Sequence, residues 1–117
     1  MSLSKKQQRF TARLSELLAY AHAKGYRLTL GDGYRDPRVF GDFGEKKAYA
    51  SANSVHKLRL AIDLNLFING EYVTDGAHSA YADLGRFWKS LDPDARWGGD
   101  FLSGDSNHFS FTHWGAQ

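Results

Sequence analysis

The sequence predicts an α+β fold in which a small antiparallel sheet is flanked by helices. Three observations predict it. Segments with helical or alternating apolar spacing occur in the order helix, strand, loop, hairpin, helix, strand; an Asn-Gly pair marks a tight hairpin; and there is no strand–helix–strand repeat. With 117 residues, 42% of them apolar, we expect a single domain over residues 1–117 that buries a real core.

Two helices are predicted. Residues 4–24 form the first, because apolar side chains recur at helical spacing from Phe10 to Ala21 and Gly25 is a suitable C-terminal stop. Residues 79–90 form the second, with their aromatic and leucine side chains on one side.

Strands are predicted where β-prone residues alternate or run together. Residues 26–30 form a short strand, and residues 60–68 form a longer one that turns at Asn69-Gly70. Residues 108–114 alternate as a last strand. The Gly- and Asp-rich segments between these elements are predicted to be loops, at 31–53 and 92–107.

Composition excludes several classes of function. The net charge is only +2, and the sequence contains no stripe of Lys and Arg interleaved with aromatic residues. We therefore expect no nucleic-acid partner. There is no cysteine, which excludes disulfides, thiolate metal sites and a cysteine nucleophile. Neither a signal peptide nor a run of 18 apolar residues is recognisable, so we expect cytoplasmic synthesis without membrane insertion.

One acid stands inside an apolar strand. Asp63 lies between Ile62 and Leu64, and a buried carboxylate is costly unless it is paired or bound to a metal. His56 precedes this strand closely enough to fold back over it, and His108 begins the last strand, which could be a neighbour in the same sheet. Two histidines and one carboxylate are a ligand set that catalytic zinc uses, with a fourth position open; other divalent ions remain possible.

A second carboxylate could then move protons. Asp105, three residues before His108, is placed to take the proton of the attacking water and pass it to the leaving amine. His113 is an alternative to His108 as ligand, but His108 is favoured because it has the acid upstream.

Four short segments resemble the D-alanyl-D-alanine and L-alanyl-D-glutamate zinc metallopeptidases, which include phage endolysins and vancomycin-resistance dipeptidases. "SVHKLRLAID" resembles their S-x-H-x(6)-D motif, and "DSNHF" resembles their second motif, an acid, two residues and then His with an aromatic. "DGYRDP" and "WGGDF" resemble the segments that precede these motifs. The resemblance runs from about Asp32 to Phe111. One departure is Arg59, where many relatives carry Gly.

The resemblance implies a role for five residues and a fold of the Hedgehog/DD-peptidase-like type. His56, Asp63 and His108 would hold Zn²⁺, and Asp105 would be the general base and acid. Arg35 would stabilise the oxyanion that develops on the scissile carbonyl, a role that suits a permanently charged fork of donors.

The activity implied is hydrolysis of a peptide bond in the peptidoglycan stem by a monomer that reaches the cell wall after release. L-Alanyl-D-glutamate cleavage by a phage or prophage endolysin is favoured, and D-alanyl-D-alanine cleavage is the alternative. A wall-binding module of the same fold and a phage structural protein are the non-catalytic alternatives.

Six further polar or aromatic residues are candidates for a place at the site. Ser54 could touch substrate or satisfy the turn before His56, and Asp100 could support a ligand histidine or be solvated. The others are expected to be structural or solvated: Trp97, His113, His22 and His78.

Overall fold

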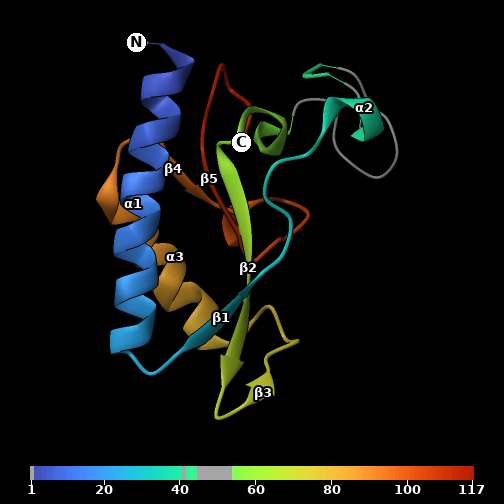
Figure 1. The fold of residues 1–117 in the computed structure, drawn as a ribbon. Helices are drawn as coiled ribbons and strands as arrows, with labels where there is room; N and C mark the ends of the chain where they lie inside the picture. The colour runs from blue at the N-terminus through green and yellow to red at the C-terminus, as the bar shows by residue number, and fades with distance from the viewer. Residues whose placement is uncertain (1, 41, 45–53) are drawn as a thin grey trace.

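The computed structural model describes residues 2–40, 42–44 and 54–117 (Figure 1). Its elements, in chain order, are α1 (Leu3–Ala23), β1 (Arg27–Leu30), α2 (Pro37–Phe40), the 3₁₀ turn η1 (Val55–Leu58), β2 (Ala61–Ile68), β3 (Glu71–Tyr72), α3 (Ser79–Leu91), β4 (Ala95–Trp97), the 3₁₀ turn η2 (Gly98–Asp100) and β5 (His108–Phe111).

The strands form one antiparallel sheet in the order β1-β2-β5-β4, with β3 paired to the end of β2. The β2–β3 hairpin turns at Asn69 and Gly70, which have φ values of 52° and 80°, as a tight two-residue turn requires. The predicted α+β class with a small antiparallel sheet is confirmed. Helices α1 and α3 lie together on one side of this sheet (Figure 1).

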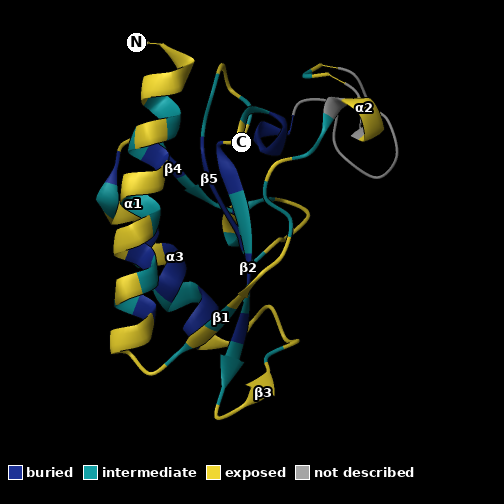
Figure 2. Ribbon diagram, in the orientation of Figure 1, coloured by how far each residue is buried: buried dark blue, intermediate teal, exposed yellow. Residues whose placement is uncertain are grey.

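Alternation along β5 separates the core from the site. Phe109 and Phe111 are fully buried and contact the aromatic side chains of the helices, whereas His108 and Ser110 face the other way. Figure 2 shows the buried positions gathered along β2, β5 and the inner side of α3. The sheet therefore has an apolar face, which packs against the helices, and a polar face, which carries the motif residues.

Edge-on aromatic contacts join the helices to β5. The Phe10 ring of α1 lies 5.6 Å from the Trp88 ring of α3 and 5.2 Å from the Phe111 ring, both nearly perpendicular. Trp88 is fully buried, and its indole N–H donates to the carbonyls of Arg96 and Ser110. Burial of each such ring stabilises the fold by about 1.5–3 kcal/mol, and the core holds β5 in place from behind.

Among the described residues, the predicted loops contain three short elements that the sequence did not indicate, α2, β4 and η2. β4 lies within 92–107, because Ala95–Trp97 finds a partner in β5 despite its length. In 31–53, α2 spans four residues, and residues 41 and 45–53 lie outside the described part of the chain. The last strand ends at Phe111, since the chain turns back at Trp114 and Gly115.

No helix in the described part of the chain is long and apolar enough to cross a membrane. α1, the longest helix, has an exposed polar side, visible in Figure 2.

Asp83 joins α3 to α1 and to the residue that precedes β1. Its two carboxylate oxygens accept hydrogen bonds from Tyr20 and Tyr26, at 2.6 and 2.8 Å, and Lys24 lies 3.6 Å away. Burial alone raises the pKa of Asp83, but these hydrogen bonds and the lysine charge outweigh it and lower that pKa.

We expect Asp83→Asn to lower the free energy of unfolding by about 1–3 kcal/mol at neutral pH. Because the pKa of Asp83 is lower in the folded chain, this contribution is fully present above about pH 4, the ordinary pKa of an unfolded Asp, and is lost as the pH falls through the folded value. Urea titrations of the wild type and the variant at several pH values from 7 to 3 measure this difference in the free energy of unfolding. Glu16→Gln, at an exposed position, is the control, and an equal effect of the two variants would contradict this role.

Candidate metal centre

The register of β2 and β5 brings the first two predicted ligands together. Asp63 is paired directly with His108, so both side chains leave the same face of the sheet at neighbouring positions. Asp63 is also fixed from the other side, because its N–H donates to Asp32 O and its carbonyl accepts from Gly31 N, both at 2.8 Å. The carboxylate thus stands between the "GDG" segment and β5.

The third side chain comes from η1, the 3₁₀ turn before β2. Ser54 begins this turn, and its hydroxyl accepts a hydrogen bond from His56 N. Arg59 ends it in the left-handed conformation, with φ 57° and ψ 35°. That conformation is one that glycine adopts most readily. Here the Arg59 guanidinium lies 4.0 Å from the centre of the Tyr34 ring, a stabilising contact that glycine cannot make.

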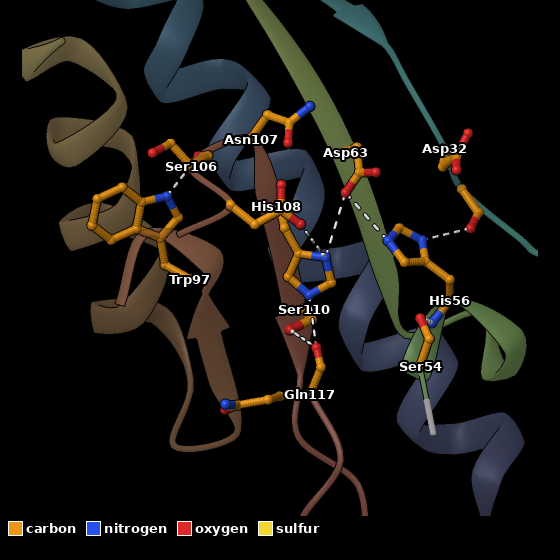
Figure 3. A network of polar contacts seen from close by, with 12 residues as sticks. Asp32, Ser54, His56, Asp63, Trp97, Ser106, Asn107, His108, Ser110 and Gln117 are labelled. Atoms are coloured by element: carbon orange, nitrogen blue, oxygen red, sulfur yellow. Dashed lines mark hydrogen bonds and ion pairs between the residues drawn. The ribbon is translucent and has the colours of Figure 1, made fainter. Parts of the chain in front are cut away.

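Backbone carbonyls decide which ring nitrogen of each histidine carries the proton. His56 Nδ1 lies 2.7 Å from Gly33 O, and His108 Nε2 lies 2.7 Å from Gln117 O. A main-chain oxygen, whether of a carbonyl or of a carboxylate, only accepts, so the nitrogen facing it must be protonated. In the neutral rings, His56 Nε2 and His108 Nδ1 therefore carry lone pairs, and both are directed at Asp63 (Figure 3).

Three atoms with lone pairs thus converge, and none of them carries a proton with which to hydrogen-bond another. Asp63 Oδ1 lies 3.2 Å from His56 Nε2 and 3.4 Å from His108 Nδ1, and all three atoms lie within 4.8 Å of one another. His56 Nε2 and Asp63 Oδ1 are buried and have no hydrogen-bond partner. Ligands 2.0–2.2 Å from a tetrahedral zinc ion lie roughly 3.3–3.6 Å apart, so the group fits such an ion.

The protonation of Asp63 suits a ligand. Burial raises the pKa of its carboxyl, but the close approach of His108 and His56 outweighs burial and holds that pKa at about 2. The carboxyl is therefore ionised at neutral pH, as metal binding requires.

Asp105 lies beside the three ligand atoms and not among them. Its Oδ2 is 3.9 Å from His108 Nδ1, and the side chain is half exposed. Burial and the charge of Asp63 raise the pKa of Asp105, while the positive groups nearby oppose the rise. A raised pKa suits a group that must both accept and release a proton.

Gly98, in the "WGGDF" segment, shapes the turn that carries this acid. Its carbonyl accepts from Asp105 N at 2.9 Å. A Cβ at Gly98 would lie 2.1 Å from Asp105 O and 2.8 Å from His108 Cβ, so only glycine allows this close approach.

A pocket of about 380 Å³ opens over the centre. Arg35 lines it together with His56, His108 and Asp105. The Arg35 guanidinium donates to Ser54 Oγ at 3.0 Å and pairs with Asp32 at 3.4 Å, so Ser54 supports both the histidine turn and the arginine. All five residues proposed from the sequence for chemistry therefore meet at one site.

Comparison with known families agrees with this arrangement. The family model described as D-alanyl-D-alanine carboxypeptidase matches residues 48–111, more than half of the chain. The chain belongs to this family of zinc peptidases. The matched range contains His56, Asp63, Asp105 and His108. No curated protein matches the chain. Membership in the peptidase family, together with the His-Asp-His group, supports a zinc-dependent metallopeptidase acting on peptidoglycan-type substrates.

The other residues weighed from the sequence lie away from the ligand atoms of this peptidase. Asp100 pairs with Lys89 at 2.7 Å and does not support a ligand histidine. Trp97 is partly buried and donates to Ser106 O, which favours packing over a place in the cleft. His113 contacts Lys6 and stacks on a neighbouring ring. The remaining two histidines are exposed: His78 is the N-cap residue that precedes α3, and His22 lies on α1.

Two contributors were missed because they act through the backbone. The carbonyls of Gly33 and Gln117 orient the two histidines, and no side-chain pattern signals such a role. Gln117 O also accepts from Ser110 Oγ at 3.1 Å. It reaches the site because the chain reverses at Trp114 and Gly115, whose φ values are 49° and 79°.

We expect Gly115→Val to weaken zinc binding by about 10- to 100-fold, because a β-branched residue disfavours the turn that presents Gln117 O to His108. Competition with a chromogenic chelator measures the affinity. Gly70→Val is the matched control, since Gly70 has φ 80° in a turn of the same kind in the β2–β3 hairpin. Gln117→Ala keeps the carbonyl and should bind zinc normally. Equal affinities of Gly115→Val and Gly70→Val would refute this role.

Proposed function

We propose that this chain is a zinc-dependent L-alanyl-D-glutamate endopeptidase that cuts the peptidoglycan stem as a phage or prophage endolysin. The observation that carries the hydrolytic part is the convergence of His56 Nε2, Asp63 Oδ1 and His108 Nδ1. The two histidines line a pocket that an acid, Asp105, and a guanidinium, Arg35, also line. We further propose that it is made in the cytoplasm as a monomer and acts on the wall after release.

In this proposal, His56, Asp63 and His108 are the metal ligands. Zinc, when bound, acidifies a water and polarises the carbonyl that it contacts. The carbonyls of Gly33 and Gln117 hold the two imidazoles in the tautomers that leave a lone pair for the ion. Burial of these side chains keeps bulk water from competing with the ligands.

Asp105 moves the proton in this mechanism. It accepts a proton from the water whose oxygen attacks the peptide carbon, and it donates that proton to the leaving nitrogen as the C–N bond breaks. Arg35 approaches the same pocket held by Ser54 and Asp32, and its guanidinium stabilises the negative charge that develops on the carbonyl oxygen.

A second candidate is D-alanyl-D-alanine carboxypeptidase activity, the activity for which the matching family is named. The two reactions need the same ligands, base and oxyanion donor, and they differ in what lies beyond the scissile bond. A non-catalytic wall-binding or phage structural module would need neither Asp105 nor Arg35 at the pocket, and the presence of both there favours an enzyme.

Digestion of purified peptidoglycan, with the products identified by mass spectrometry, tests the proposal. We expect wild-type chain to release fragments cut between L-alanine and D-glutamate, and a chelator to abolish this. Asp105→Asn should keep zinc and lose about 100- to 10,000-fold in rate, because the proton carrier is gone. His56→Ala should lose zinc as well as activity.

Asp100→Asn is the matched control, an exposed acid on the neighbouring turn that pairs with Lys89. It should keep both zinc and activity. Zinc-bound wild-type chain without turnover would favour a binding module, and Asp105→Asn with the normal rate would show that the base is another residue.

A further inference from the structure

An enzyme that cuts inside a peptide must hold residues on both sides of the bond. The position of the proton donor tells the two sides apart, because the donor must reach the leaving nitrogen. Asp105 is that donor in the proposed function, on which this inference rests. The leaving residue must therefore lie next to Asp105.

A second pocket, of about 260 Å³, borders Asp105. Asp105 is the one residue that it shares with the pocket over the metal ligands, among the described residues that line the two. One wall is formed at the end of β3 and just after it, by Tyr72, Val73, Thr74 and Gly76, and another by residues 104–107, which precede β5. The two pockets thus meet at the proposed proton donor.

Hydrogen bonds hold the walls of this second pocket in place. Ser106 Oγ donates to Gly76 O at 2.7 Å and joins the two segments. Tyr81, also in the lining, donates from its hydroxyl to Val73 O at 3.2 Å and anchors the first segment to α3. The hollow is therefore built by contacts between elements and does not depend on a ligand to form.

The charge of the lining points to the kind of group that it accepts. Asp105 is the one charged side chain among the described residues that line the pocket, and no Lys, Arg or His is among them. A free carboxylate on the leaving residue would lie near Asp105 with no lining cation to pair with, which is unfavourable. A peptide or carboxamide group has no such penalty.

We propose that this pocket is the subsite for the residue on the amine side of the scissile bond, and that it selects a leaving residue whose carboxyl is amidated or in peptide linkage over one with a free carboxylate. The subsite favours cutting within a stem peptide over removing a C-terminal residue. It assigns a role to Thr74, an exposed lining residue, that the metal site does not require.

Two synthetic stem peptides that differ only in the leaving residue, one ending in a carboxylate and one in a carboxamide, test the proposal. We expect zinc-loaded wild-type chain to cleave the carboxamide at least about tenfold more efficiently, as judged by kcat/KM. Thr74→Lys places a cation in the pocket and should reduce or reverse this preference. Thr11→Lys, on the exposed side of α1, is the control and should keep it.

The outcomes separate the subsite from the proposed function. If the zinc-loaded wild type cleaves neither of the two peptides nor peptidoglycan, the proposed function is wrong, and the proposed subsite falls with it. If it cleaves both peptides equally, or prefers the carboxylate, the function stands and the subsite is overturned. A preference that is the same in Thr74→Lys and Thr11→Lys also overturns it, provided that both variants bind zinc like the wild type.

Discussion

The pairing of Asp63 with His108 across β2 and β5 is the constraint on which the rest of the site depends. A shift of one residue in this register would turn one of the two side chains into the apolar core. The core opposes such a shift, because Phe109 and Phe111 must face the helices for His108 to face the pocket. The same packing that stabilises the sheet therefore sets the geometry of the candidate metal site.

The protonation pattern follows from the backbone around this pair. Gly33 O and Gln117 O accept hydrogen bonds from one N–H of each imidazole, which leaves the lone pair of the other ring nitrogen directed at an ionised carboxylate. Such an arrangement is unfavourable unless a cation lies between the groups. Buried polar atoms without a hydrogen-bond partner are uncommon in folded proteins, so their presence at His56 Nε2 and Asp63 Oδ1 points to function.

Much of this arrangement could be predicted from the sequence. Helical spacing gave α1 and α3, and an acid within an apolar strand marked Asp63 as unusual. β4 was missed because three residues in a Gly- and Asp-rich stretch carry no periodicity, and its strand character comes from pairing with β5. Contacts of main-chain oxygens depend on the path of the chain and not on the type of side chain. The roles of Gly33 O and Gln117 O therefore could not be predicted from the sequence. The left-handed Arg59 was visible only as a departure from the family motif.

The central claim is that two imidazoles and one carboxylate bind a single divalent ion with a free position. Zinc K-edge X-ray absorption on the chain loaded with one equivalent of zinc tests it most directly. The account predicts about four nitrogen or oxygen neighbours near 2.0–2.1 Å, with the outer-shell scattering of two imidazole rings. Zinc that remains in solution, or a bound ion with an all-oxygen shell and no imidazole scattering, would contradict it.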